Sequence, residues 1–283
     1  VRGATVDGIE SHPDDGFKVV VRDTEDIFCD AVLIATGGVR NALARAPVDL
    51  TRHVIEPPVP SLFTFRIDDP ELVELAGISV DSAIISVPGS SLTSSGPVLV
   101  THWGLSGPAV LRISAWGARE LEACDYRFEL QVDWSGGGES AVSLRGKFSR
   151  QRQSHGARSV IRNSILEGVP RRLWSRLVRM AGIPEDTLWS GLSKPQIGAL
   201  CRLVLGEVLQ VDGKSMNKEE FVTCGGVNLK DIDLTSMQSR RVSGLYFAGE
   251  VLDVDGLTGG FNFQSAWTTG RIAGESIANK LLG

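Results

Sequence analysis

Short apolar runs separated by polar turns fill the N-terminal part of the chain. Residues 4–9, 17–22 and 27–35 carry these runs, and acidic turns at 14–16 and 23–26 separate them. Runs of this length bounded by turn residues are typical of β-strands. The pattern predicts a small antiparallel meander that leads into one strand of a parallel sheet.

The middle of the chain changes from strand-like to helix-like patterning. After a proline-rich stretch at 57–60, which we interpret as a domain exit, short strands are expected at 62–67, 82–87, 98–100 and 126–134. A helix is predicted from about Pro108 to Leu121. Residues 159–209 have helical periodicity, broken by Pro170, Pro184 and Pro195.

The C-terminal part contains the most informative pattern. Residues 245–248 form a continuous apolar run, as in a fully buried strand, and Gly249-Glu250 breaks it. A glycine pair then leads into a long helix for which Asn262 is the predicted N-cap. We expect residues 31–36 and 245–248 to be neighbouring parallel strands. The apolar positions of the helix recur at Phe263, Ala266, Trp267, Gly270, Ala273, Ile277 and Leu281.

Composition narrows the function classes only slightly. Hydrophobic residues make up 42% and charged residues 22% of the 283 residues, as in ordinary soluble globular proteins. A net charge of −5 gives no overall attraction to nucleic acid or to an anionic membrane, and no apolar run approaches a membrane span. The separated cysteines predict thiols in the cytoplasm or another reducing compartment. They are Cys29, Cys124, Cys201 and Cys224.

A binding site is predicted where the apolar run 245–248 ends. Glu250 and Asp253 can accept hydrogen bonds from ligand hydroxyls, and the alternative is a solvent-exposed acidic turn. Backbone N–H groups at the start of the helix can bind an electron-rich ring edge, although a tight structural turn would have the same sequence. These groups belong to Gly259, Gly260, Phe261 and Asn262. A calcium loop is excluded, because the ligand spacing and the terminal Glu are missing.

Three other features carry weaker hypotheses. His102 is either a proton donor or, as we favour, a structural histidine, and Cys224 is interpreted as a spectator thiol. The histidines lack metal-ligand spacing, so no metal site is predicted. A basic run could contact RNA, an anionic substrate or a nicotinamide phosphate, but a solvated helical face is preferred over nucleic acid. Its members are Arg145, Lys147, Arg150, Arg152, Arg158, Arg162, Arg171, Arg172, Arg176 and Arg179, against the single acid Glu167.

Four motifs in the same order resemble one flavoprotein family. They are AVLIATGG at 31–38, THWGLSGPA at 101–109, FVTCGGVNLK at 221–230 and LYFAGEVLDVDGLTGGFNFQ at 245–264. Together they resemble the HI0933-like, or BaiN-like, FAD-dependent oxidoreductases, some described as aminoacetone oxidases. The resemblance implies FAD as cofactor and adds Thr36, Gly37 and Gly38 to the predicted cofactor-binding residues.

The resemblance also implies an α/β fold with a partial, three-layer, two-dinucleotide-binding-type FAD domain. This domain would comprise residues 1–60 and 215–283. A β-rich, barrel-like domain would be inserted at 61–146 and about 205–215, and a small helical subdomain at 147–204. The family's G-x-G-x-x-G turn does not occur here. After Gly38 the family usually has a glycine-rich loop, whereas residues 39–51 form a short segment without glycine. We therefore expect a C-terminal part of a longer flavoprotein, which binds FAD poorly by itself.

The resulting hypothesis is a flavin-dependent oxidoreductase. It would pass a hydride or electrons between a small organic substrate and either oxygen or NAD(P)H, and the catalytic residues cannot be assigned because the flavin performs the difficult chemistry. Two alternatives remain: a noncatalytic remnant of the fold, and an RNA-associated protein that uses the arginine-rich segment.

Overall fold

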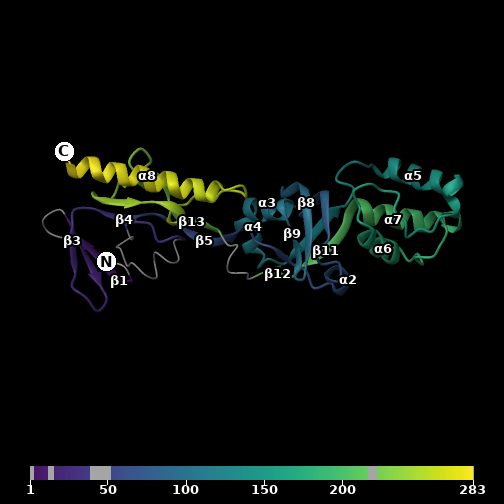
Figure 1. Ribbon diagram of the computed structural model, residues 1–283, viewed down its shortest axis with the longest axis horizontal. Helices are drawn as coiled ribbons and strands as arrows, with labels where there is room; N and C mark the ends of the chain where they lie inside the picture. The colour runs from purple at the N-terminus through teal and green to yellow at the C-terminus, as the bar shows by residue number, and fades with distance from the viewer. Residues whose placement is uncertain (1–2, 12–15, 39–51, 216–221, 283) are drawn as a thin grey trace. The chain divides into compact units, whose positions relative to one another are not determined.

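The chain folds into two compact units. The computed structural model describes residues 3–11, 16–38, 52–215 and 222–282, so the loop 39–51 and His12 lie outside the described residues. The first unit joins both ends of the chain, Val1–Leu62 with Glu219–Gly283, and the second is the continuous segment Phe63–Lys218. Figure 1 shows the elements of both.

The first unit begins with the antiparallel meander that the sequence predicts. Strand β1 (Val6–Ser11) pairs with β2 (Phe17–Val21), and β2 pairs with β3 (Ile27–Cys29). The chain then enters β4 (Val32–Ile34), which lies parallel to β16 (Leu245–Phe247) in the register Leu33 to Tyr246. The predicted pairing of two strands more than 200 residues apart is confirmed.

Two further pairings complete the sheets of the first unit. Strands β14 (Ile232–Asp233) and β15 (Gln238–Ser239) extend the sheet in the order β14-β15-β16-β4, with antiparallel pairing except at β4. Strand β5 (Ile55–Ser61) pairs with β13 (Val222–Val227) in a two-stranded ribbon. The proline-rich stretch 57–60 therefore lies within a strand. A two-stranded ribbon tolerates these prolines because each strand has one unpaired edge.

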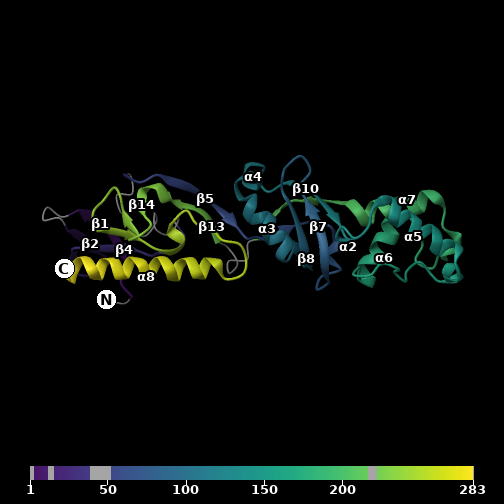
Figure 2. The same ribbon diagram turned by 90° about the horizontal axis from the view of Figure 1, so that it is seen from above.

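A long helix packs along the first unit. After a 3-10 turn, η5 (Gly249–Val251), helix α8 (Phe261–Leu282) contacts η5 and β16, and Figure 2 shows it from a second direction. Ala273 of α8 is buried in the core together with Ile9, Phe17 and Phe247. The predicted apolar face is wrong at three positions, because Phe263 and Trp267 are each 69% exposed and Leu281 is 55% exposed.

A seven-stranded antiparallel sheet forms the centre of the second unit. Its order is β11-β10-β7-β8-β9-β6-β12. The continuous segment that contains β11 and β12 pairs with β10 at one edge and with β6 at the other, which closes the sheet in the manner of a barrel. The bounds are β6 (Phe65–Arg66), β7 (Ser79–Ser86), β8 (Thr93–Thr101), β9 (Gly104–Ser106), β10 (Phe128–Asp133), β11 (Glu207–Val211) and β12 (Gly213–Lys214).

Short helices accompany this sheet. Helix α2 (Pro70–Val73) is capped by the Asp69 carboxylate, which accepts from the N–H groups of Glu71 and Leu72. The predicted helix from Pro108 to Leu121 is present as two helices, α3 (Pro108–Trp116) and α4 (Ala118–Ala123). Gly117 separates them because its backbone leaves the helical conformation and caps both.

The remaining helices surround an aromatic cluster. They are α5 (Ala141–Gln153), α6 (Arg171–Met180) and α7 (Lys194–Gly206), with 3-10 turns at His155–Arg158 and Trp189–Gly191. Phe148, Trp174 and Trp189 have ring centroids 5.5–6.4 Å apart and are fully buried. Helices α6 and α7 begin at Pro170 and near Pro195, so two of the predicted proline breaks coincide with helix starts. Across the described residues, no helix combines the length and apolar character that a bilayer span requires.

One buried arginine joins these helices to the sheet. The guanidinium of Arg176 on α6 forms ion pairs with Glu207 of β11 and with Asp69, to which it is 2.5 Å away. Glu207 also accepts from the indole N–H of Trp134 at 2.7 Å. Burial disfavours the charge on Arg176, but both carboxylates outweigh this and raise its pKa. The group is a structural salt-bridge network, since every charge in it has a partner.

Candidate functional site

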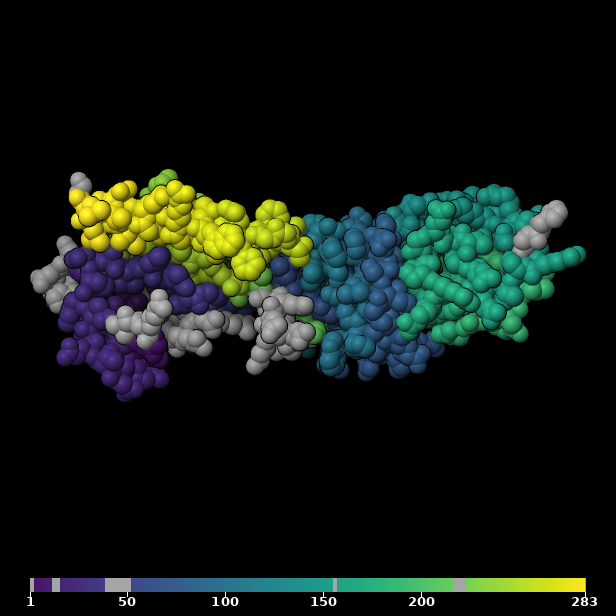
Figure 3. Space-filling view, in the orientation of Figure 1, coloured from purple at the N-terminus to yellow at the C-terminus, as the bar shows by residue number. Residues whose placement is uncertain are grey.

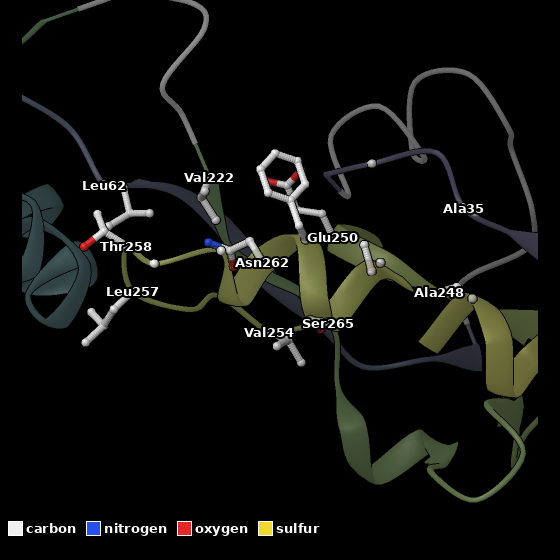
Figure 4. Close-up of a pocket in the computed structure, with 17 residues that line it drawn as sticks. Ala35, Leu62, Val222, Ala248, Glu250, Val254, Leu257, Thr258, Asn262 and Ser265 are labelled. Carbon is white, nitrogen blue, oxygen red and sulfur yellow. The ribbon is translucent and has the colours of Figure 1, made fainter. Parts of the chain in front are cut away.

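A pocket of about 660 Å³ lies in the first unit, where three turns meet. These are the turn after β4, the turn after β16 and the start of α8. Figure 4 shows Glu250 and Asn262 beside the first turns of α8, with Leu62 and Val222 beside the ends of β5 and β13. The lining residues include Ala35, Gly37, Leu62, Val222, Ala248, Gly249, Glu250, Leu257, Gly259, Gly260, Asn262, Phe263, Ser265 and Ala266.

Four of the predicted glycines line this pocket in conformations that favour glycine. Their φ angles are +80° at Gly37, +76° at Gly249, +116° at Gly259 and +83° at Gly260. L-residues with a side chain avoid this region, and β-branched residues most strongly. A Cβ on Gly37 or Gly260 would meet no atom within 4 Å, so it would project into open space. The glycines therefore keep the backbone walls accessible to a ligand.

The start of α8 provides backbone donors at the pocket. The first hydrogen bond of the helix runs from Gln264 N–H to Gly260 O (2.9 Å). The N–H groups of Phe261, Asn262 and Phe263 precede that bond, and such groups have no partner within the helix. They lie at the positive end of a 22-residue helix. This end of the pocket is suited to a negative or electron-rich ligand edge.

Asn262 has a different role from the predicted one. The helix already includes Phe261, so Asn262 is in the first turn and is not the N-cap. Its amide forms two bonds with Gly256: Oδ1 accepts from the N–H (2.7 Å), and Nδ2 donates to the carbonyl (2.9 Å). The side chain thereby fixes the loop that carries Leu257 and Gly259 to the pocket.

The two predicted carboxylates occupy different positions. Glu250 lines the pocket, and its Oε1 accepts from the N–H of Thr223 (2.8 Å). Asp253 is half-buried outside the lining, and its own N–H donates to the carbonyl of Val227 (3.0 Å). The nearby Asp255 accepts from the hydroxyl of Ser61 (2.9 Å). Geometry therefore separates Glu250 from the other acids of this segment.

The other predicted site residues border the pocket without lining it. Thr36 is exposed, and Gly38 is buried where a Cβ would approach Thr223 Oγ1 to 2.5 Å. Phe261 is 61% exposed. Six of the ten predicted residues are thus brought together as lining residues, and the remaining four flank them: Thr36, Gly38, Asp253 and Phe261.

Several lining residues were not found by sequence reasoning. Leu62 and Val222 reach the pocket from the ends of the β5–β13 ribbon, which no local motif marks. Phe263 also lines it and stacks on Trp267, with centroids 6.1 Å apart. In Figure 3, α8 forms a continuous part of the visible surface of the first unit. The sequence carried no signal for Phe263, because exposed and buried aromatic residues recur at the same helical spacing.

The weaker candidates lie elsewhere. His102 is exposed and borders a separate pocket of about 610 Å³ in the second unit, with Arg66, Asp68 and Trp103. Cys224 is half-buried on β13, and the four cysteines form no disulfide. Among the described residues, no group of His, Cys, Asp and Glu is arranged to hold a metal ion.

Comparison with known proteins gives consistent matches. Residues 59–222 match the family described as HI0933-like protein barrel and H2TH domain. Two relatives named ribosomal RNA dihydrouridine synthase are 33% identical over 251 residues (Escherichia coli) and 31% identical over 261 residues (Haemophilus influenzae). A 3-dehydro-bile acid delta(4,6)-reductase from Clostridium scindens is 27% identical over 275 residues.

These matches cover most of this chain but less of the relatives. They include 85%, 89% and 93% of this chain and 59%, 61% and 65% of the respective relatives. The family match includes more than half of the chain and covers the closed sheet and the helices α5 to α7. All three relatives carry enzyme names, as expected for a family of oxidoreductases. The chain belongs to the HI0933-like family.

Proposed function

We propose that the pocket of the first unit holds the isoalloxazine and ribityl parts of FAD, and that the whole protein is a flavin-dependent reductase. The observation that carries this proposal is the convergence of four left-handed glycines, one carboxylate and a helix start on one pocket. In this proposal, residues 1–60 and 215–283 form a two-dinucleotide-binding-type domain, of which the parallel pair β4–β16 is the central part.

The residues of the pocket fit a flavin. The wall is mainly apolar, with Leu62, Val222 and Leu257 suited to a planar ring. Gly260 leaves open space where any side chain would project. The carboxylate of Glu250, fixed by Thr223, is suited to a ribityl hydroxyl, which donates to it.

Each part of the pocket has a role in the proposed reaction. A bound flavin supplies hydride transfer. With a flavin bound, the N–H groups at the start of α8 would stabilise negative charge on the ring, and the apolar wall would exclude water from it. No proton donor is assigned to a described residue.

The names of the relatives suggest the type of substrate. A dihydrouridine synthase and a delta(4,6)-reductase both add hydrogen across a carbon–carbon double bond. We infer that this protein also reduces a double bond conjugated with a carbonyl, in uridine of RNA or in a small organic molecule. NAD(P)H is the proposed electron donor. Oxygen, the other electron partner expected from the sequence, accepts electrons and would serve only a reaction in which the substrate is oxidised.

The test uses the protein as its gene encodes it. We expect the purified protein to retain FAD, visible by its absorbance, and to be reduced anaerobically by NADH or NADPH. Reoxidation is then followed with a uridine-containing RNA or with a 3-oxo-4,6-diene steroid. A protein that stays colourless after incubation with excess FAD would contradict the proposal and support a noncatalytic remnant.

A further inference from the structure

Three residues of the basic run seen in the sequence are neutralised in the structure. Lys147 pairs with Glu139, and Arg179 lies 2.7 Å from Glu185 and 3.7 Å from Glu71. Arg176 is buried between its two carboxylates. These residues stabilise the fold and are not available to a partner.

Two other residues of the run line a cleft between α5 and α7, together with two cations of α7. The cleft measures about 590 Å³ and contains four cationic side chains, Arg145 and Arg152 from α5 and Lys194 and Arg202 from α7. Arg145, Lys194 and Arg202 are exposed, and Arg152 is half-buried. Within the described part of the chain, none of the four forms an ion pair, and none of the residues lining the cleft is acidic.

The cations of the two helices converge on one place. Burial raises the pKa of the Cys201 thiol on α7, and the positive charges of Arg145 and Arg202 counteract that rise. Both arginines therefore act on the same thiol from different helices. The wider segment 141–206 contains 12 Lys and Arg against 3 Asp and Glu, in a protein whose net charge is −5. The positive charge is local, and it remains after the internal ion pairs are formed.

The spacing of the charges fits an extended anion. Arg145 and Arg152 are seven residues apart on α5, or about 10 Å along the helix axis, and Lys194 and Arg202 are about 12 Å apart on α7. Each row is longer than one phosphate group, so it can contact more than one phosphate along a nucleic-acid strand. A single small anion would contact only part of this cleft.

We propose that the cleft between α5 and α7 binds the phosphate backbone of RNA. The choice of RNA rests on the proposed function, in which uridine of RNA is one of the possible substrates. Ser149 and Gln153 of the cleft add polar groups for phosphate or sugar oxygens. No aromatic side chain lies among the described lining residues, so recognition here is of the backbone and does not depend on base stacking. An anionic membrane is disfavoured, since the lining residues include only two apolar side chains, Pro195 and Ile197.

The test measures binding of a fluorescein-labelled, single-stranded RNA of about 16 nucleotides by the complete protein, from about 50 to 200 mM salt. We expect R145E/R152E to weaken binding at least tenfold and to lower the salt slope by about 1.4, which corresponds to two phosphate contacts. The matched control is R162E/R171E, which changes two exposed arginines of the same unit outside the cleft by the same total charge. It should weaken binding less than about threefold. Unchanged thermal unfolding of both variants shows that they fold.

Equal losses in both variants would overturn the proposal, because overall charge would then explain the binding. Binding of inorganic triphosphate or of phosphatidylglycerol vesicles without binding of RNA would also overturn it. Flavin content is read from absorbance in the same samples. If the wild-type protein retains flavin but does not bind RNA, the RNA-binding cleft alone is refuted. If it binds RNA but holds no flavin, the proposed reductase alone is refuted.

Discussion

The glycine-lined pocket and the basic cleft are built in opposite ways. The pocket of the first unit uses backbone conformation: four glycines with positive φ and the start of α8 form its walls. The cleft of the second unit uses long side chains on two regular helices, such as Arg145 on α5 and Arg202 on α7. A backbone site needs particular residues at fixed spacing, whereas a side-chain site needs only compatible charges on facing elements.

The difference explains which site the sequence reveals. The pocket leaves a local signal, because Gly249, Gly259 and Gly260 fall within twelve residues. The arginine run is visible too, but its meaning depends on partners that are distant in sequence. Arg176 is neutralised by Asp69, which lies 107 residues away, while Arg145 is not neutralised. Only the fold distinguishes a structural arginine from an available one.

The largest expected effect is on stability, and it tests that distinction. Arg176→Met should lower the free energy of unfolding by about 3–5 kcal/mol, because it leaves the buried Glu207 carboxylate without its cation. Arg145→Met should change it by less than about 0.5 kcal/mol, since Arg145 is exposed. Urea denaturation of the two variants measures both values.

A double variant serves as the control for the first substitution. In R176M/E207Q the unpaired buried charge is removed, so part of the lost stability should return. If Arg145→Met proved as damaging as Arg176→Met, the division of the arginines into structural and available groups would be wrong.

The second effect concerns the backbone-built site. Gly260→Val should reduce FAD retention by more than tenfold in the complete protein. A valine at φ +83° is strained, and its side chain would occupy the open space beside the pocket. His102→Ala should leave FAD content unchanged, since His102 borders a different pocket. FAD is quantified by absorbance after gel filtration. Equal content in the two variants would count against the pocket.

The sequence predicted the first unit well for physical reasons. Buried strands such as 245–248 are visible in the sequence as short apolar runs, and the glycine pairs Gly37-Gly38 and Gly259-Gly260 mark turns. The pairing of β4 with β16 could therefore be anticipated. The contributions of Leu62 and Val222 could not, because they depend on where the β5–β13 ribbon ends in space. Periodicity also failed at Phe263 and Trp267, since exposed aromatic residues follow the same spacing as core residues.

A third prediction uses pH to mark a structural carboxylate of the first unit. Asp231 is 2% exposed and accepts from the Val54 N–H (2.7 Å) and from Arg241 Nε (2.8 Å). The Val54 bond, helped by Arg241 and opposed by burial, lowers the pKa of Asp231. A lowered pKa means that the carboxylate stabilises the fold above its unfolded pKa of about 3.9, and that this contribution is lost as pH falls through the folded value.

Asp231→Asn should therefore destabilise the protein by about 1–2 kcal/mol at neutral pH. The amide NH₂ replaces one acceptor oxygen and would face either the Val54 N–H or the Arg241 Nε–H, both of which are donors. Below about pH 4 the carboxyl becomes protonated in the unfolded state, and as pH falls through the lowered pKa of folded Asp231 the difference in stability between the two proteins should shrink. Urea denaturation across this range measures it. A difference that stayed constant with pH would show that the charge of Asp231 contributes nothing.

The smallest effect separates the two predicted carboxylates of the pocket segment. Glu250→Ala should weaken FAD retention about three- to tenfold, equivalent to about 0.7–1.4 kcal/mol, the range of a typical hydrogen bond to a ligand hydroxyl. Asp253→Ala should have less effect, because Asp253 lies outside the pocket lining while Glu250 is fixed in it by Thr223. Glu250→Gln keeps the acceptor for Thr223, so the part of the loss that persists in Glu250→Gln comes from the missing carboxylate and not from collapse of the turn. If Asp253→Ala weakened FAD more than Glu250→Ala, the ribityl chain would have to run along the other side of the turn after β16, and the orientation of the flavin in this pocket would need to be reversed.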